Sequence, residues 1–255
     1  MKNTTFLNLC ATAIVSLGAL TPAIAATPAE ARKVYNDHKS SIYGVKGILK
    51  LNITFQGQAK EQEAPIWSNA TCIDNGLFVV AYNSISPDVN VGNRPGVEIN
   101  KQIEELKLVN SSGEEFDAKL VLHDEDLGLA FIAIDPKAEN NKDWKGKAVD
   151  ISKDPILQHF DETITIAREN ANMRFQAAAQ KGSVSTIIQK PRTFYKVRGA
   201  AMSAPTFNEK GEFVGITVAK KSAVAGQSAV PVTVPAKYIR GLAEQAKAKQ
   251  AELAK

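Results

Sequence analysis

Three histidines, His38, His123 and His159, are the side chains in this sequence best suited to proton transfer near neutral pH. His123 is followed by three acidic residues (124–126), a run that also suits a metal ion or a general base. We interpret this run as a solvated acidic turn, because a metal site needs converging ligands and neighbours along a strand point to opposite faces. His159 forms a His-x-Asp pair with Asp161, and no serine elbow lies near it, so we interpret the pair as structural. The sequence therefore predicts no metal site and no cofactor.

The first 25 residues have the three parts of a secretory signal peptide. Lys2 supplies the positive start, residues 6–20 are mostly apolar, and residues 23–25 form an Ala-x-Ala cleavage pattern. We therefore expect an exported bacterial protein, periplasmic or secreted, whose mature chain begins at Ala26. A membrane anchor is the less favoured alternative, because the apolar run is short and ends at Pro22. No later stretch is apolar enough to cross a membrane, so we expect no transmembrane segment in the mature chain.

Charge and cysteine content narrow the possible functions. The 255 residues carry a formal charge of +4, which becomes +3 when Lys2 is removed with the signal peptide. Lysine and arginine are interspersed with aspartate and glutamate, whereas nucleic-acid binding usually needs clustered basic residues, so we expect no nucleic-acid partner. Cys72 is the only cysteine after residue 25 and cannot form an internal disulfide. Because it lies in an apolar stretch, we interpret it as a small core residue and not a reactive thiol.

Short segments with a hydrophobic period of two follow a predicted helix at residues 28–39, which Pro28 opens. The sequence Asn-Ser-Ser-Gly at 110–113 predicts a hairpin turn. Pro235 precedes an alanine- and lysine-rich segment that predicts a final helix. The predicted strands are 42–54, 66–73, 77–82, 104–109, 115–123, 129–134, 162–167, 183–189, 213–218 and 229–233.

This pattern predicts an all-β fold of two β-barrels side by side with a C-terminal helix. The expected parts are a signal peptide at 1–25, an N-terminal segment and first barrel at 26–135, a polar inter-barrel connection at 136–155, a second barrel at 156–234 and the C-terminal helix at 235–255.

Several segments carry a resemblance to a known family. Residues 112–121 are SGEEFDAKLV, and residues 122–135 continue as LHDEDLGLAFIAID. They resemble the DGREFDAKVV hairpin of HtrA/Deg serine proteases and the sequence that follows it. Residues 182–185, 205–216 and 230–232 resemble further strands of that family, in family order. The likeness implies a chymotrypsin/trypsin-like double β-barrel with an active-site cleft between the barrels, and because the chain ends after the last helix we expect no PDZ domain.

The resemblance also implies a catalytic histidine, aspartate and serine, and another residue type stands at each of these positions. Asn83 falls at the histidine position (Ser84 with a shift of one residue), Gly128 at the aspartate position and Met202 at the serine position. An amide is no useful base, glycine has no side chain to orient a base, and a thioether is no acyl-transfer nucleophile. The glycines around the family's serine are also replaced, in residues 200–204. We therefore expect no catalytic residue at the family's positions.

The leading hypothesis is an inactive exported protein on a protease scaffold, a pseudoprotease, which binds a peptide or protein in the inter-barrel cleft. The alternative is an active serine endopeptidase with a relocated catalytic constellation, for which Ser203, His123 and Asp126 are the fallback candidates. A third hypothesis is a structural subunit of an envelope assembly that uses the final helix. We interpret the basic pair Lys220-Lys221 as a solvated strand end, with a cleft for an acidic peptide as the alternative. The sequence sets neither the ligand nor the oligomeric state.

Overall fold

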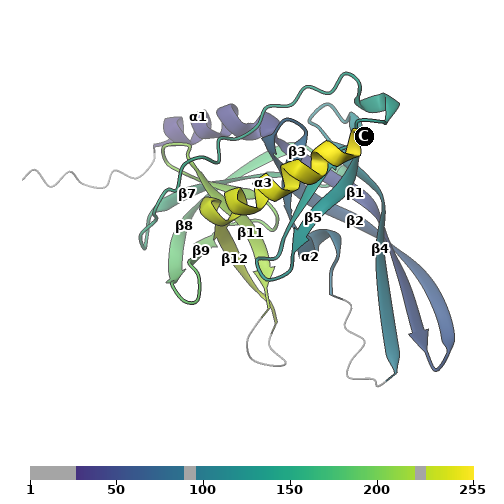
Figure 1. Cartoon of the computed structure of the whole chain (residues 1–255). Helices are drawn as coiled ribbons and strands as arrows, with labels where there is room; N and C mark the ends of the chain where they lie inside the picture. The colour runs from purple at the N-terminus through teal and green to yellow at the C-terminus, as the bar shows by residue number, and fades with distance from the viewer. Residues whose placement is uncertain (1–26, 89–95, 222–227) are drawn as a thin grey trace, which may run out of the picture.

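The computed structural model describes residues 27–88, 96–221 and 228–255, so the predicted signal peptide lies outside the described residues. Within them the chain forms two closed antiparallel β-barrels of six strands each and a long C-terminal helix, which confirms the predicted fold class. Figure 1 shows the two barrels side by side, with helix α3 (Ala236–Leu253) lying across them.

Both barrels have the same strand order, β1-β2-β3-β6-β5-β4 in the first and β7-β8-β9-β12-β11-β10 in the second. The chain therefore repeats one topology twice, although its sequence shows no internal repeat. The strands of the first barrel are β1 (Ile42–Phe55), β2 (Gln58–Asp74), β3 (Leu77–Ala81), β4 (Val97–Val109), β5 (Glu115–Asp124) and β6 (Leu129–Ile134). Those of the second are β7 (Glu162–Arg168), β8 (Ala177–Ile188), β9 (Phe194–Arg198), β10 (Pro205–Asn208), β11 (Phe213–Lys220) and β12 (Val230–Pro235).

Short helices connect or precede these strands. Helix α1 (Pro28–His38) and the 3-10 turn η1 (Lys39–Ser41) precede the first barrel. Helix α2 (Tyr82–Ile85) directly follows β3, and the 3-10 turns η2 (Glu139–Asn141) and η3 (Ala171–Met173) lie in loops.

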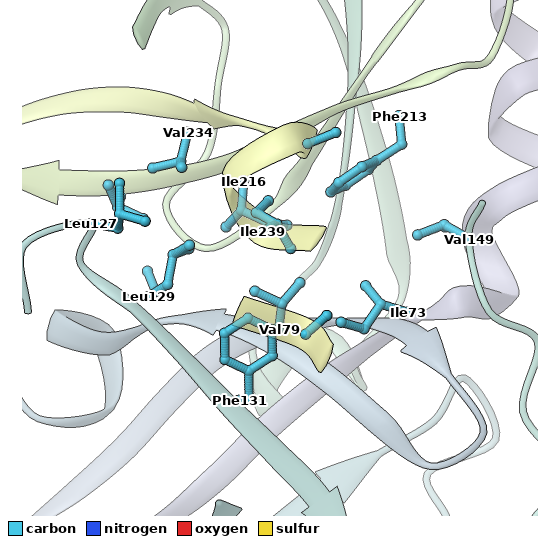
Figure 2. Packing of buried hydrophobic residues seen from close by; sticks show 14 of the residues in the cluster. Ile73, Val79, Leu127, Leu129, Phe131, Val149, Phe213, Ile216, Val234 and Ile239 are labelled. Carbon is cyan, nitrogen blue, oxygen red and sulfur yellow. The ribbon is translucent and has the colours of Figure 1, made fainter. Parts of the chain in front are cut away.

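Strand β3 is buried on both faces, which explains its continuous apolar sequence. Successive side chains on a strand point to opposite faces. Phe78 and Val80 accordingly belong to the core of the first barrel, whereas Val79 belongs to a second cluster that joins the barrels. In that cluster Val79 packs with Ile216 of β11 and Ile239 of α3 (Figure 2). This shared core holds the end of β3 and the start of β6 in place. Asn83 follows the end of β3, and Gly128 directly precedes β6.

Helix α1 packs on the second barrel, although the sequence places it next to the first. The side chain of Thr27 accepts a hydrogen bond from the Glu30 N–H, and the Glu30 carboxylate accepts one from the Thr27 N–H, so a capping box starts the helix. At the other end, the His38 ring stacks on Phe207 with ring centroids 4.2 Å apart. The His38 Nε2 atom lies 3.0 Å from the Gly211 carbonyl oxygen, which ties α1 to the β10–β11 turn.

Helix α3, at the other end of the chain, contacts the first barrel. It follows the last strand of the second barrel, and it contacts β3, β5 and β6 of the first barrel as well as β11 and β12 of the second. Its buried positions include Ile239, Ala243 and Ala246, so the docked face continues past the first two turns. Near its end, Lys247 pairs with Asp74 of β2 at 2.9 Å. Each terminal helix therefore contacts the barrel from which it is distant in the sequence.

The buried side chain of Arg168, at the end of β7, also links the two barrels. Its Nε donates to the Ile42 carbonyl oxygen at 2.7 Å, Nη1 to the Phe175 oxygen at 3.3 Å and Nη2 to the Lys39 oxygen at 2.6 Å. The backbone N–H of Arg168 donates to the side-chain oxygen of Asn69 in β2 at 2.5 Å. The guanidinium is thus held by backbone carbonyls from both barrels, and burial lowers its pKa below the usual value.

Candidate functional site

A cleft of about 430 Å³ opens between the two barrels. Helix α2, β4 and the β5–β6 turn line it from the first barrel, and the end of β11 and the residue before β12 line it from the second. Its volume lies within the range of about 300–1,000 Å³ that is usual for ligand pockets. Tyr82, Ile99 and Leu127 give it apolar surface, and lysine and carboxylate side chains stand among its other lining residues.

Helix α2 positions Asn83 in the wall of this cleft. The backbone N–H of Tyr82 donates to the carbonyl oxygen of Gly128 at 2.8 Å, so the start of α2 lies against the β5–β6 turn. The Oδ1 atom of Asn83 is buried and has no hydrogen-bond partner within the described residues. An unpaired buried acceptor is unfavourable, so this atom lowers the stability of the fold.

Gly128 lines the same cleft and has a left-handed backbone conformation, with φ of 68°. It ends a turn in which the Asp124 carboxylate accepts a hydrogen bond from the Leu127 N–H at 2.8 Å. A Cβ atom at Gly128 would lie 3.5 Å from Val218, which is an ordinary contact distance. The backbone conformation, and not a lack of space, therefore favours glycine at this position.

Met202 lies in the loop 199–204 that precedes β10, with its side chain 38% exposed. The next residue, Ser203, has the left-handed φ of 61°, whereas Ala200 and Ala204 do not have positive φ. The Ser203 N–H donates to the Thr217 carbonyl oxygen at 2.8 Å, and the Ala200 N–H donates to the Val197 carbonyl oxygen at 3.5 Å. With Met202 at the nucleophile position, Ala200 would supply one of the oxyanion donors, and its N–H is already engaged. Met202 itself is not among the residues that line the 430 Å³ cleft.

Two hydrogen bonds bring the three family-matched segments together. The Ala81 N–H donates to Ser203 Oγ at 2.8 Å, which joins the segment of Asn83 to that of Met202. The Tyr82–Gly128 bond joins the segment of Asn83 to the β5–β6 turn. The segments therefore meet where the barrels touch, while only Asn83 and Gly128 of the three contribute to the cleft wall.

Ser203, His123 and Asp126, the candidates for a relocated catalytic constellation, have separate roles in the structure. The Ser203 hydroxyl is fully buried, and besides accepting from Ala81 it donates to the Asn69 carbonyl oxygen at 2.6 Å. The exposed His123 ring stacks on Tyr82 with centroids 4.5 Å apart. Asp126 forms ion pairs with Arg192 and Lys220. None of the hydrogen bonds found in the described residues joins Ser203 to a histidine.

The other titratable residues considered from the sequence lie elsewhere. His159 is an exposed residue shortly before β7, and His38 is in the contact of α1 with the second barrel. Cys72 is buried, and desolvation raises the pKa of its thiol to about 12, so it stays protonated at neutral pH. Across the described ranges, no group of three or more His, Cys, Asp or Glu side chains has the geometry to hold a metal ion.

The charges at the cleft form two clusters, each with one carboxylate between two cations. Asp88 lies 3.1 Å from Lys221 and 3.8 Å from Lys101. Asp126 pairs with Arg192 and lies 3.9 Å from Lys220, whose Nζ also donates to the Asp126 carbonyl oxygen at 3.1 Å. The sequence patterns did not single out Asp88 or Lys101, because nothing in the local sequence shows that β4 reaches the cleft.

No family model matches the chain, and no curated protein is similar to it in sequence. The likeness to the HtrA/Deg proteases thus depends on the quoted motifs and on the double barrel, whose two six-stranded sheets fit a trypsin-like fold. Helices in the described part of the chain are all too short or too polar to span a bilayer.

Proposed function

We propose that this protein is an inactive, exported relative of the HtrA-type trypsin-like proteases that binds peptide or protein segments in the cleft between its barrels. One observation carries the proposal. The chain folds as a double barrel, and the resemblance in sequence assigns Asn83, Gly128 and Met202 to the base, the orienting acid and the nucleophile. Without a base and a nucleophile, acyl transfer loses orders of magnitude in rate, whereas a cleft between the barrels remains.

The alternative, an endopeptidase built on Ser203, has less support. A serine nucleophile needs an accessible Oγ and a base that accepts its proton. The Ser203 hydroxyl is fully buried and donates a hydrogen bond to the Asn69 carbonyl oxygen, which cannot act as a base at neutral pH. The left-handed backbone of Ser203 also suits the role of a turn residue.

The residues that line the cleft suit the binding of an extended peptide segment. Its apolar surface from Ile99 and Leu127 suits a side chain of the ligand. Export is part of the same proposal and depends on residues 1–25, whose composition is that of a signal peptide.

The catalytic half of the proposal is tested with the purified mature protein and an active trypsin-like protease as positive control. We expect no labelling by a fluorophosphonate probe and no cleavage of unfolded casein. Labelling that disappears in Ser203→Ala, with the variant shown to be folded by circular dichroism, would establish the alternative instead.

The binding half is tested on an array of immobilised peptides of varied composition. Ala229 lines the cleft and is exposed, so Ala229→Trp fills the cleft without disturbing a core. Ala29, an exposed residue of α1, provides the matched control Ala29→Trp. We expect the wild type and Ala29→Trp to bind the same peptides and Ala229→Trp to lose them. Equal binding by all three proteins would place the peptide site outside the cleft.

A further inference from the structure

Strands β4 and β5 close the first barrel, but they pair with each other over only a short stretch. Residues 107–109 of β4 pair with residues 115–117 of β5. Beyond this stretch, residues 97–104 of β4 pair with β1 alone, and β5 pairs with β6 alone from residue 118 to residue 124. Figure 1 shows β4 running on into an arm with β1 and β2, while β5 stays in the barrel wall. Within the described residues the two strands therefore separate, and the edges that they turn toward each other have no strand partner.

A β-bulge at Glu105 lies where β4 turns away from β5. Glu105 and Leu106 both stand opposite Gly47 of β1, because the register of the two strands shifts at this point. Glu105 has a left-handed φ of 50°, a conformation that is uncommon for residues other than glycine. The register of β5 against β6 shifts as well, directly after Leu120. A bulge bends its strand and interrupts regular pairing, so irregularities in both strands maintain the opening between them.

The opening forms a hollow of about 510 Å³. Its apolar lining consists of Ile103 and Leu106 of β4 and Ala118 and Leu120 of β5. All four side chains belong to the core of the first barrel or pack against it. Four consecutive residues of β5, 117–120, line the opening, so the free edge of this strand runs along one side of it. The opening thus combines apolar surface with a strand edge that can accept a further strand.

The charged residues at the opening favour a basic ligand. Three carboxylates and one lysine line it, and this lysine, Lys119, pairs with Asp135 at 2.7 Å. The Asp117 carboxylate lies 3.7 Å from Lys107, which does not line the opening. Glu105 is exposed at the bulge, and none of the ion pairs found in the described residues includes it. A lysine or arginine side chain of a ligand can therefore pair with Glu105 without displacing another cation.

We propose that the opening between β4 and β5 binds an extended, basic peptide segment of a partner protein, which adds as a strand to the free edge of β5. Main-chain hydrogen bonds to the edge supply affinity in this mode, and side chains supply specificity. Successive side chains of a strand point to opposite faces, so alternating apolar and basic residues would direct apolar groups to Ile103 and Leu120 and a cation to Glu105. The opening shares no lining residue with the inter-barrel cleft, so this second site goes beyond the proposed function.

The basic class is tested with three capped peptides of equal length, whose binding to the mature protein is measured by titration calorimetry. The first alternates lysine with leucine, the second glutamine with leucine and the third glutamate with leucine. We expect the lysine peptide to bind about fivefold tighter than the glutamine peptide, and the glutamate peptide to bind more weakly than both. Glu105→Gln should remove this preference for lysine, whereas Glu209→Gln, at an exposed position outside the opening, should keep it. Equal binding of the lysine and glutamine peptides by the wild type would overturn the basic class.

Backbone pairing is tested with two further lysine–leucine peptides, one N-methylated at every leucine and the other at every lysine. Along a strand, the N–H groups of alternate residues point to the same side, so only one of the two sets faces β5. We expect one methylated peptide to lose about tenfold or more in affinity and the other to bind like the parent peptide. Unchanged binding of both peptides, or equal losses in both, would contradict strand addition to a single edge.

The variant Ala229→Trp, which fills the inter-barrel cleft, separates this inference from the proposed function. Binding of the lysine–leucine peptide should be unchanged in Ala229→Trp, because the opening lies outside the cleft. Loss of binding in Ala229→Trp, with no change in Glu105→Gln, would place the peptide in the cleft. That result would overturn the second site and support the proposed function. Failure of the lysine–leucine peptide to bind at all would overturn the second site alone, since the cleft has its own test on the peptide array.

Discussion

The Oγ atom of Ser203 accepts a hydrogen bond from the N–H of Ala81 at 2.8 Å, and this bond joins the loop before β10 to the last residue of β3. The same hydroxyl donates to the Asn69 carbonyl oxygen at 2.6 Å. Ser203, which the sequence offers as a candidate nucleophile, thus forms buried hydrogen bonds that join the two barrels. Its loss should be measured as a change in stability.

Replacing Ser203 with alanine should lower the free energy of unfolding by about 1–3 kcal/mol, because the buried Ala81 N–H loses its partner. Ser203→Gly should be more stable than Ser203→Ala by about 1 kcal/mol, since glycine accepts the left-handed φ of 61° without strain. Urea unfolding measures both. The control is Ser185→Ala, whose hydroxyl bonds the Lys196 carbonyl oxygen on the surface and should change stability by less than about 0.5 kcal/mol. A Ser203→Ala protein as stable as the wild type would contradict the bridging role.

Restoring the three side chain types together, with Asn83→His, Gly128→Asp and Met202→Ser, should not restore proteolysis. An aspartate at 128 would have to adopt the left-handed φ of 68°, which costs about 1–2 kcal/mol. With Met202 at the nucleophile position, the family's oxyanion donors would be the N–H groups of Met202 and Ala200. The Ala200 N–H already donates to the Val197 carbonyl oxygen at 3.5 Å, and one lost oxyanion donor costs about 2.7–4 kcal/mol in the transition state. Casein and activated-ester hydrolysis are the assays, with circular dichroism as a check of folding. Rapid casein cleavage by the folded triple variant would show that the loop retains an oxyanion site.

Stability should depend on pH through His38. Burial against Phe207 lowers the pKa of this ring, while its bond to the Gly211 carbonyl oxygen and the charge of Asp37 act in the opposite direction. Lys33 and Lys147 add a smaller lowering. The unfolded chain, with its histidine pKa near the usual value of about 6.5, therefore takes up a proton first as the pH falls. The free energy of unfolding should decrease as the pH falls through this value, until the folded ring also becomes protonated.

The measurement is urea unfolding of the wild type and His38→Gln from neutral to mildly acidic pH. Both proteins share the pH dependence that comes from the carboxylates, so it cancels in the difference between their free energies of unfolding. Only the wild type should show the additional decrease in this free energy that comes from His38. His159→Gln, at an exposed position, serves as the control and should keep the wild-type pH profile. Parallel profiles for the wild type and His38→Gln would mean that the ring is not neutral in the fold.

Lysine should not replace Arg168. The guanidinium donates to three carbonyl oxygens in a fixed geometry, and a lysine ammonium on a flexible chain cannot reach all three. We expect Arg168→Lys to lower the free energy of unfolding by about 1–3 kcal/mol, because buried carbonyls lose their donors. The exposed Arg198→Lys is the matched control and should change stability little. If both variants were equally stable, the buried contacts of Arg168 would not contribute to the fold.

The sequence predicted the bounds of several strands to within one residue. The predicted 129–134 matches β6, and 77–82 exceeds β3 by one residue, because both strands lie between two cores. The turn at 110–113 was also predictable: Asn110 Oδ1 accepts from the N–H groups of Ser112 and Glu114, and Gly113 has positive φ. In these elements the local sequence and the tertiary surroundings favour the same structure.

Strands β2, β4 and β8 were predicted several residues too short, and β9 and β10 were not predicted. The first half of β2, from Gln58 to Glu63, is polar and exposed, because it belongs to an arm of β1, β2 and β4 that extends beyond the barrel (Figure 1). β9 and β10 have only five and four residues, too few for a periodic signal. The charges of the cleft were missed for a related reason: Asp88 and Lys221 lie far apart in the sequence, and only the barrel packing brings them within 3.1 Å.

The crossing of α1 onto the second barrel has a consequence for biosynthesis. His38 and the carbonyl of Gly211, which it contacts, are 173 residues apart. A chain synthesised from its N-terminus therefore leaves α1 without its docking surface until β7, β10 and the β10–β11 turn have been made. Helix α1 would thus stay undocked for most of translation, after all strands of the first barrel have been made.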